Sequence, residues 1–156
     1  MRILELKAMR GPNSWSVRRH KLIVMRLDIE GLEQRPTDKI PGFYERITAL
    51  LPSMQSHRCS EDHEGGFWMR VKRGTWMGHV IEHIALEIQS LAGMETGFGR
   101  TRETKTSGIY NVVFSYVEEN VGLYAAEASV RIADALVKGT NYDLAADIQK
   151  MREIRE

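Results

Sequence analysis

Short segments of this chain alternate apolar and polar residues in the manner of strands. The segments Arg2 to Met9 and Lys21 to Ile29 repeat apolar residues at a spacing of two, which predicts two half-buried strands. Phe67 to Val71, which follows Gly65-Gly66, predicts a third strand, and the apolar-rich run Ile109 to Val117 predicts a fourth.

Three longer segments repeat apolar residues at helical spacing. The first spans residues 43–51 and ends before Pro52, because proline cannot continue the backbone hydrogen bonding of a helix. The second spans 75–93, and Thr75 suits its N-cap position. Its apolar stripe consists of Trp76, Met77, Val80, Ile81, Ile84, Ala85, Ile88 and Leu91. The third spans 118–139 and begins with acidic residues, which favour a helix N-terminus.

The order of these elements favours an α+β fold class, because helices do not separate the strands regularly. We expect one α+β domain over residues 1–138, with a sheet of about four strands, antiparallel or mixed, packed by three main helices. Residues 139–156 are charged and carry only a weak apolar stripe. We expect them to form a helical tail or a linker to further domains.

The composition narrows the classes of partner. With 156 residues and 42% hydrophobic content, the chain can form one domain with a core. Its net charge of +1 provides no overall field for nucleic acid or an anionic membrane. A single cysteine excludes an internal disulfide framework, and no long apolar run suggests a membrane span. We therefore expect a cytoplasmic protein without nucleic-acid or membrane partners, and leave homo-oligomer formation open.

The most specific chemical pattern is the sequence from His79 to His83, which reads H-x-x-E-H, the inverted form of a zinc-peptidase motif. On a helix, His79 and His83 stand one turn apart on the same face, so both imidazoles can bind one Zn²⁺ ion. Glu82 could then act as general base toward a bound water. The motif lies on the central predicted helix and indicates a metallohydrolase.

The motif supplies only two protein ligands, whereas catalytic zinc normally takes three. Glu119 is the first candidate for the third ligand and Glu118 the second. A carboxylate at the start of a helix after a core strand could reach the motif helix packed beside it. His63 and Cys59, before the predicted third strand, are lower-ranked alternatives.

The glycine-containing segment from Gly97 to Thr104 predicts a basic loop that could bind anions. Its Arg100 and Arg102 could bind substrate carboxylates through planar two-point contacts. Ordinary structural interpretations stand beside these. A match as short as H-x-x-E-H also arises by chance on polar helix flanks, and neighbouring arginines are often solvated surface charge.

Longer stretches, in order through residues 1 to about 138, resemble the N-terminal domain of cyanophycin synthetases. Together they are far more specific than the five-residue motif. They are Arg10-Gly11-Pro12-Asn13-Ser14-Trp15-Ser16, Lys21-Leu22-Ile23-Val24-Met25-Arg26-Leu27-Asp28, Pro41-Gly42-Phe43-Tyr44, Gly65-Gly66-Phe67, Gly78-His79-Val80-Ile81-Glu82-His83 and Gly97-Phe98-Gly99-Arg100-Thr101-Arg102-Glu103-Thr104.

The resemblance implies a domain from a large enzyme that extends a poly-aspartate backbone and attaches arginine to its side chains. ATP and Mg²⁺ would serve ATP-grasp-like and Mur-ligase-like domains that this chain lacks. The implied partners are those remaining domains of the parent synthetase and the cyanophycin polymer. Because the polymer is zwitterionic, Arg100 and Arg102 would meet its carboxylates. Its guanidinium groups would meet glutamates near the motif, namely Glu87, Glu95, Glu103 or Glu118.

The family resemblance also implies a polymer-binding role for this domain and, in some members, a site that cuts cyanophycin to create chain ends for extension. The leading hypothesis is a zinc-dependent hydrolase that cleaves the cyanophycin backbone. Glu82 is its catalytic base, and His79, His83 and Glu119 are its metal ligands. The alternative is a non-catalytic cyanophycin-binding and assembly module. A third interpretation, a free-standing metalloenzyme similar to S-ribosylhomocysteine lyase, shares only the short motif and is disfavoured.

Overall fold

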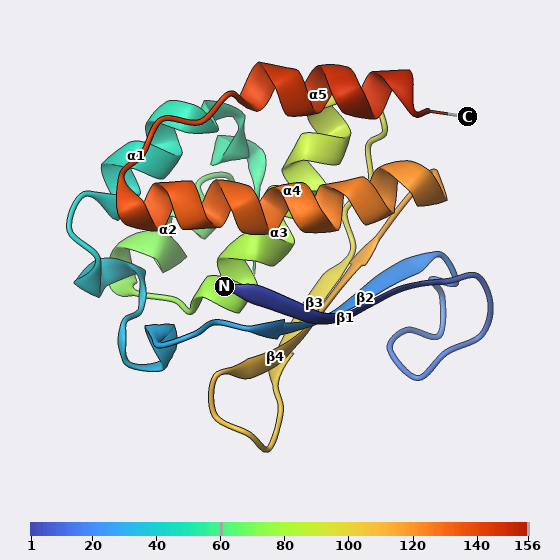
Figure 1. The fold of residues 1–156 in the computed structure, drawn as a ribbon, viewed down its shortest axis with the longest axis horizontal. Helices are drawn as coiled ribbons and strands as arrows, with labels where there is room; N and C mark the ends of the chain where they lie inside the picture. The colour runs from blue at the N-terminus through green and yellow to red at the C-terminus, as the bar shows by residue number, and fades with distance from the viewer. Residues whose placement is uncertain (60, 156) are drawn as a thin grey trace.

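The computed structural model describes residues 1–59 and 61–155. Its sheet has four strands in the order β1-β2-β4-β3, and every neighbouring pair is antiparallel (Figure 1). The strands are β1 (Arg2–Met9), β2 (Leu22–Asp28), β3 (Gly99–Glu103) and β4 (Ile109–Ser115). The predicted α+β class and four-stranded sheet are therefore confirmed, and of the two arrangements expected, antiparallel or mixed, the sheet is antiparallel.

The described residues contain five α-helices. The helices expected from apolar spacing correspond to α1 (Phe43–Leu50), α3 (Met77–Leu91) and α4 (Glu119–Lys138). Two further helices are α2 (Gly66–Arg73) and α5 (Leu144–Glu153), of which α5 lies in the predicted tail. Short 3₁₀ helices are η1 (Leu32–Gln34), η2 (Thr37–Lys39) and η3 (Pro52–Ser56).

The predicted strand from Phe67 to Val71 is wrong, because these residues belong to α2. Gly65, with φ of 81°, precedes the helix in a left-handed conformation. Phe67, Trp68 and Val71 are then buried together at positions that one helix face brings side by side. A short apolar run does not distinguish a strand from one buried helix turn, so the spacing alone was ambiguous.

The fourth strand is β3, in the segment that was expected to form a loop. β3 is an edge strand and pairs with β4 alone. None of its residues is fully buried, so it lacks the alternation of apolar residues that signals a strand. Its polar side chains are instead available to the neighbouring surface.

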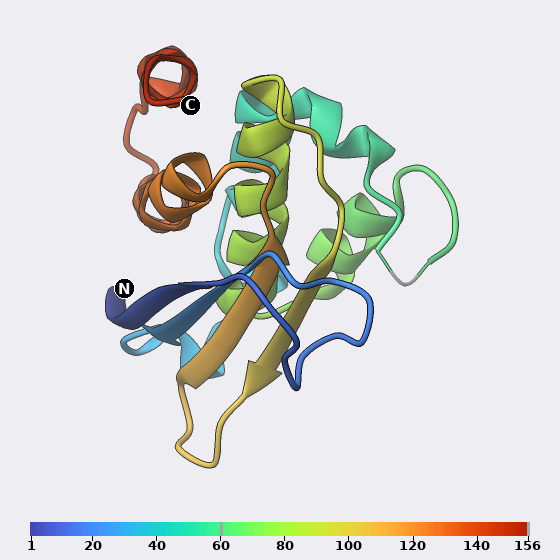
Figure 2. The same ribbon diagram turned by 90° about the vertical axis from the view of Figure 1, so that its right-hand side faces the viewer.

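The helices lie on one side of the sheet, as Figures 1 and 2 show. On this side the central strands contribute fully buried residues, namely Ile23, Met25, Leu27, Val112 and Phe114. The opposite face has a smaller cluster of Leu22, Val24 and Val113. Trp15, in the connection between β1 and β2, packs against this cluster. Both faces of β2 are therefore covered.

Helix α3 is central, because it packs against β3, β4 and α4. Most of its residues are buried. Gly78, in its first turn, allows a close approach to the sheet, since a Cβ there would lie 3.1 Å from the ring of Tyr110.

None of the described helices combines the length and hydropathy needed to cross a bilayer.

The predicted tail contains a docked helix, α5, although its last residue, Glu156, lies outside the described residues. Met151 is fully buried against the core. Asp147 accepts hydrogen bonds from Tyr124 Oη at 2.6 Å, from Arg131 at 3.1 Å and from the hydroxyl of Tyr142. One buried carboxylate thus connects α5 to α4 and to the turn between them.

Asp147→Asn should destabilise the fold, because it removes the charge that Arg131 and the two tyrosines solvate. We expect a loss of about 1–3 kcal/mol in the free energy of unfolding, measured by urea denaturation. Glu153→Gln, at an exposed position of the same helix, is the matched control and should change it by less than about 0.5 kcal/mol. Equal effects of the two substitutions would contradict the role given to Asp147.

Candidate functional site

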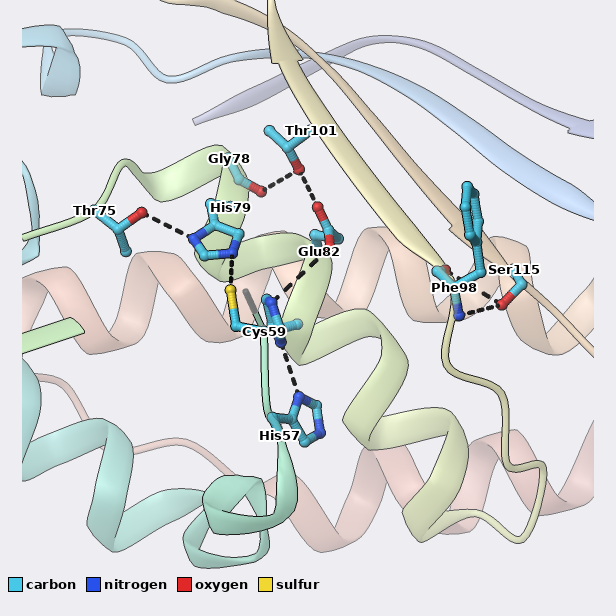
Figure 3. A network of polar contacts seen from close by, with 10 residues as sticks. His57, Cys59, Thr75, Gly78, His79, Glu82, Phe98, Thr101 and Ser115 are labelled. Carbon is cyan, nitrogen blue, oxygen red and sulfur yellow. Dashed lines mark hydrogen bonds and ion pairs between the residues drawn. The ribbon is translucent and has the colours of Figure 1, made fainter. Parts of the chain in front are cut away.

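A pocket of about 880 Å³ opens beside α3. Its walls come from α3, from η3 with the segment that follows it, from β3 with the residues before it, and from Arg70 of α2. Figure 3 shows several of the lining side chains. His79, Glu82 and His83 all line this pocket. The fold therefore places the three motif residues at one cavity, together with side chains from distant parts of the sequence.

Cys59 lies close to the two motif histidines. Its Sγ lies 3.2 Å from His79 Nε2 (Figure 3). One donor atom from each of Cys59, His79 and His83 lies within 4.8 Å of the others. Thr75 Oγ1 lies 2.8 Å from His79 Nδ1. This hydrogen bond occupies Nδ1, so the other ring nitrogen, Nε2, faces the sulfur. A thiol and two imidazoles thus converge in a way that could hold one metal ion.

Burial keeps both imidazoles neutral. Burial, with a smaller contribution from Arg70, lowers the pKa of His79 to about 4. Burial is also the main reason that the pKa of His83 falls well below its ordinary value, and unfavourable electrostatic interactions with His79, His57 and Arg70 add to the effect. Neutral imidazole is the form that binds metal ions, so both rings are in the ligating state near neutral pH.

Glu82 lies beside this cluster, with Oε1 4.0 Å from His83 Nε2. Thr101 of β3 donates a hydrogen bond of 2.6 Å to its Oε2 (Figure 3). Burial raises the pKa of Glu82 to about 7, although the Thr101 hydrogen bond acts in the opposite direction. Gly99 makes room for the side chain, because a Cβ there would lie 2.7 Å from Glu82 Cγ. A carboxyl held in this way is suited to accept a proton near neutral pH.

His57 extends the cluster behind His83. Its Nδ1 lies 2.9 Å from His83 Nδ1, and its Nε2 lies 2.6 Å from Glu87 Oε2. Burial alone would raise the pKa of Glu87, but hydrogen bonds from His57 and Ser53 outweigh burial and lower it. Glu87 is therefore an ionised carboxylate. Sequence reasoning missed His57, because it lies in another segment at no regular spacing from the motif.

Charged residues of both signs line the rest of the pocket. Arg100 and Arg102 from β3 are among them, and Arg100 donates a hydrogen bond of 3.3 Å to the Trp15 carbonyl. Glu95 also lines the pocket, as does Glu87, whereas Glu103 and Glu118 are not among the lining residues. The assignment of the two arginines to substrate carboxylates stays a prediction.

The structure does not bring Glu119 or Glu118 into this pocket. Glu119 accepts a hydrogen bond from Arg10, and Glu118 lies 3.6 Å from Arg155. None of the lining residues belongs to α4, whose described residues pack on the apolar stripe of α3. His63 is also outside the lining. Cys59, ranked below the two glutamates from the sequence, is the candidate that the fold places beside His79.

Comparison with known proteins connects this site to a family. The model of the cyanophycin synthase-like N-terminal domain matches residues 23–138 of the chain. The chain belongs to this family. The matched region includes the pocket residues from η3 through β3, so the candidate site is part of the family domain.

Curated relatives of the family are similar along nearly the whole chain. The cyanophycin synthetase of Synechocystis sp. is 54% identical over 99% of this chain, and that of Geminocystis herdmanii is 53% identical over 99%. The cyanophycin synthetase of Crocosphaera subtropica is 53% identical over 100% of this chain. The chain spans about 18% of the length of each of these relatives. It therefore corresponds to a part of much longer synthetases.

Ionisation of Glu82 should weaken the metal-free fold. The folded chain raises its pKa from 4.5 to about 7, so the folded state binds this proton more tightly than the unfolded state. The resulting stability is fully present below the unfolded pKa and is lost as pH rises through the folded one. In EDTA, the stability of the wild type relative to Glu82→Gln should fall by about 2–3 kcal/mol between about pH 4 and pH 8. Urea denaturation at several pH values measures this difference, and a constant difference would contradict the account.

Proposed function

We propose that this chain is a zinc-dependent hydrolase domain that cleaves the peptide backbone of cyanophycin and supplies primers for its parent synthetase. The observation that carries the proposal is the convergence of Cys59, His79 and His83 beside Glu82 in one pocket. Cys59 replaces Glu119 as the proposed third ligand, because Glu119 is engaged by Arg10 outside that pocket.

The donor set fits zinc. Thiolate and imidazole are ordinary zinc ligands, whereas calcium and magnesium prefer oxygen. Three protein donors leave a fourth position for water or substrate, as catalytic zinc requires. Zinc held by Cys59, His79 and His83 would act as a Lewis acid that polarises the scissile carbonyl and acidifies water.

Glu82 carries the proton transfers in this proposal. Its carboxylate takes a proton from the attacking water while the water oxygen adds to the amide carbonyl carbon. The same group then returns the proton to the amide nitrogen, and the C–N bond breaks to leave an acid and an amine. Thr101 keeps the carboxylate oriented through its hydrogen bond.

The charges of the pocket support a zwitterionic substrate. Arg100 and Arg102 provide planar donors for carboxylates, and Glu95 provides an acceptor for guanidinium groups. Cyanophycin repeats both groups along a peptide backbone. A pocket with both signs of charge suits such a polymer better than a uniformly basic one.

The parent protein accounts for the remaining cofactors and partners. We place ATP and Mg²⁺ in its other domains, which would extend the polymer in the cytoplasm. Those domains and cyanophycin itself are the proposed partners of this chain.

A non-catalytic cyanophycin-binding and assembly module is the second candidate. The mixed charge of the pocket favours it too, because the arginines and Glu95 could bind the polymer without chemistry at the motif. This candidate predicts that polymer binding survives substitution of His79, Glu82 and His83, and that the wild type releases no short chains.

Glu82→Gln should abolish cleavage while the chain keeps its fold and its zinc, because an amide cannot act as a base. We expect a loss of at least about 10²-fold in the release of short chains from purified cyanophycin. Chelation of the wild type should have the same effect. Zinc content and thermal unfolding of the variant are the controls. If the folded, zinc-loaded wild type binds cyanophycin but releases no chains, the hydrolase proposal is wrong and the binding module is favoured.

Gly99→Ala should move Glu82 without removing it, because the new Cβ would overlap the glutamate side chain. We expect about a 10- to 100-fold loss of cleavage at unchanged zinc content. Gly97→Ala is the matched control, since no atom lies within 4 Å of a Cβ at that position. Equal activity of the two variants would show that the exact position of Glu82 does not matter.

A further inference from the structure

We propose that His57 and Glu87 are positioning residues that fix the tautomer of the His83 ring. They hold the proton on Nδ1 and so keep the Nε2 lone pair available to the metal ion. This inference rests on the proposed metal site at Cys59, His79 and His83. It adds a set of residues behind that site that neither the motif nor the family match identifies.

The contacts of His57 with Glu87 and with His83 support one arrangement of the protons on the two imidazole rings. An ionised carboxylate only accepts hydrogen bonds, so His57 Nε2 must donate to Glu87 Oε2 across 2.6 Å. The other nitrogen of His57, Nδ1, faces His83 and serves as a hydrogen-bond acceptor in the proposed arrangement. This Nδ1 lies 2.9 Å from His83 Nδ1, a contact that requires one proton between the two atoms. In the proposed arrangement His83 supplies this proton from Nδ1 and keeps the lone pair on its Nε2.

The second motif histidine has the same pattern. Thr75 Oγ1 lies 2.8 Å from His79 Nδ1 and can accept its proton, while His79 Nε2 faces Cys59 Sγ at 3.2 Å. Both rings thus have a partner at Nδ1, while Nε2 of His79 faces Cys59 and Nε2 of His83 faces Glu82 at 4.0 Å. Two independent partners, from different segments, produce one ligand geometry.

The supporting groups are held firmly. The His57 backbone N–H donates to the Met54 carbonyl at 3.0 Å, and its carbonyl accepts from Phe67 N at 3.1 Å. Ser53 donates to the second oxygen of Glu87. The ring of Phe67 stacks on His83, with centroids 4.1 Å apart and an interplanar angle of 23°. The His83 ring is therefore restrained in its plane by Phe67 and at its edge by His57.

Loss of His57 should allow the proton of His83 to move from Nδ1 to Nε2. An imidazole without a partner at Nδ1 can carry its proton on either nitrogen, and a proton on Nε2 blocks metal binding. Outer hydrogen bonds of this kind typically contribute about 10- to 100-fold to metal affinity. His57 and Glu87 should therefore change the affinity for zinc without themselves binding it.

The test is the zinc affinity of the folded chain, measured by competition with a chromogenic chelator. His57→Ala and Glu87→Ala should each weaken binding by about 10- to 100-fold. His57→Asn should restore much of the affinity, because its side-chain oxygen can accept the proton of His83 Nδ1. Asp147→Asn, which alters a comparably buried carboxylate outside the pocket lining, is the control for general destabilisation and should keep wild-type affinity.

Cobalt substitution gives a second readout that is independent of activity. The thiolate-to-cobalt charge-transfer absorption band should persist in the His57 and Glu87 variants at saturating metal, because Cys59 remains a ligand. Wild-type zinc affinity in both alanine variants would overturn the inference and leave the proposed function intact. An asparagine variant as weak as His57→Ala would also overturn it, because His57 would then act as more than a hydrogen-bond acceptor. A wild type that binds no zinc would overturn the proposed metal site itself.

Discussion

The packing of α3 against the sheet is the constraint on which the rest of the structure depends. Its apolar stripe faces the core strands and α4, which fixes the rotation of the helix about its axis. One residue of rotation on a helix is about 100°, so a different register would turn His79, Glu82 and His83 away from the pocket. Gly78 and Gly99 make the fit possible, because each replaces a side chain where helix and sheet come close.

The same packing buries polar groups that would cost free energy without partners. Glu82, His83 and Glu87 are all less than 10% exposed. Each has a partner within the cluster. Burial raises the pKa of Glu82 and lowers that of His83, whereas hydrogen bonds outweigh burial at Glu87 and lower its pKa. Among the described side chains, only Gln89 Oε1 is buried without a hydrogen-bond partner. A site of this kind is less stable than an apolar core would be, and that difference is what a functional role would explain.

The sequence predicted most of the framework, because periodicity reports burial. The helices α1, α3 and α4 bury one apolar face, and the apolar residues of β1, β2 and β4 are frequent enough to signal strands, although β2 is buried on both faces. The failures have the same physical origin. Phe67 to Val71 is too short for its period to be read, and β3 is an edge strand with no apolar alternation.

The candidate site could be predicted only where its residues share one helix. His79, Glu82 and His83 have a spacing that the sequence displays directly. Cys59 and His57 come from an irregular segment after η3, and only the tertiary fold places them beside α3. Glu119 was ranked first as a ligand from its helix-start position, but α4, although it packs against α3, supplies none of the residues that line the pocket.

The most direct measurement of the central claim is X-ray absorption at the zinc edge of the zinc-loaded chain. If Cys59, His79 and His83 hold the metal, the spectrum should show one bound zinc with one sulfur neighbour at about 2.3 Å and two imidazole nitrogens at about 2.0–2.1 Å. In Cys59→Ser the sulfur contribution should disappear while the imidazole contribution remains. A bound zinc with no sulfur neighbour in the wild type, or a folded chain that retains no zinc, would contradict the metal site on which the proposed function depends.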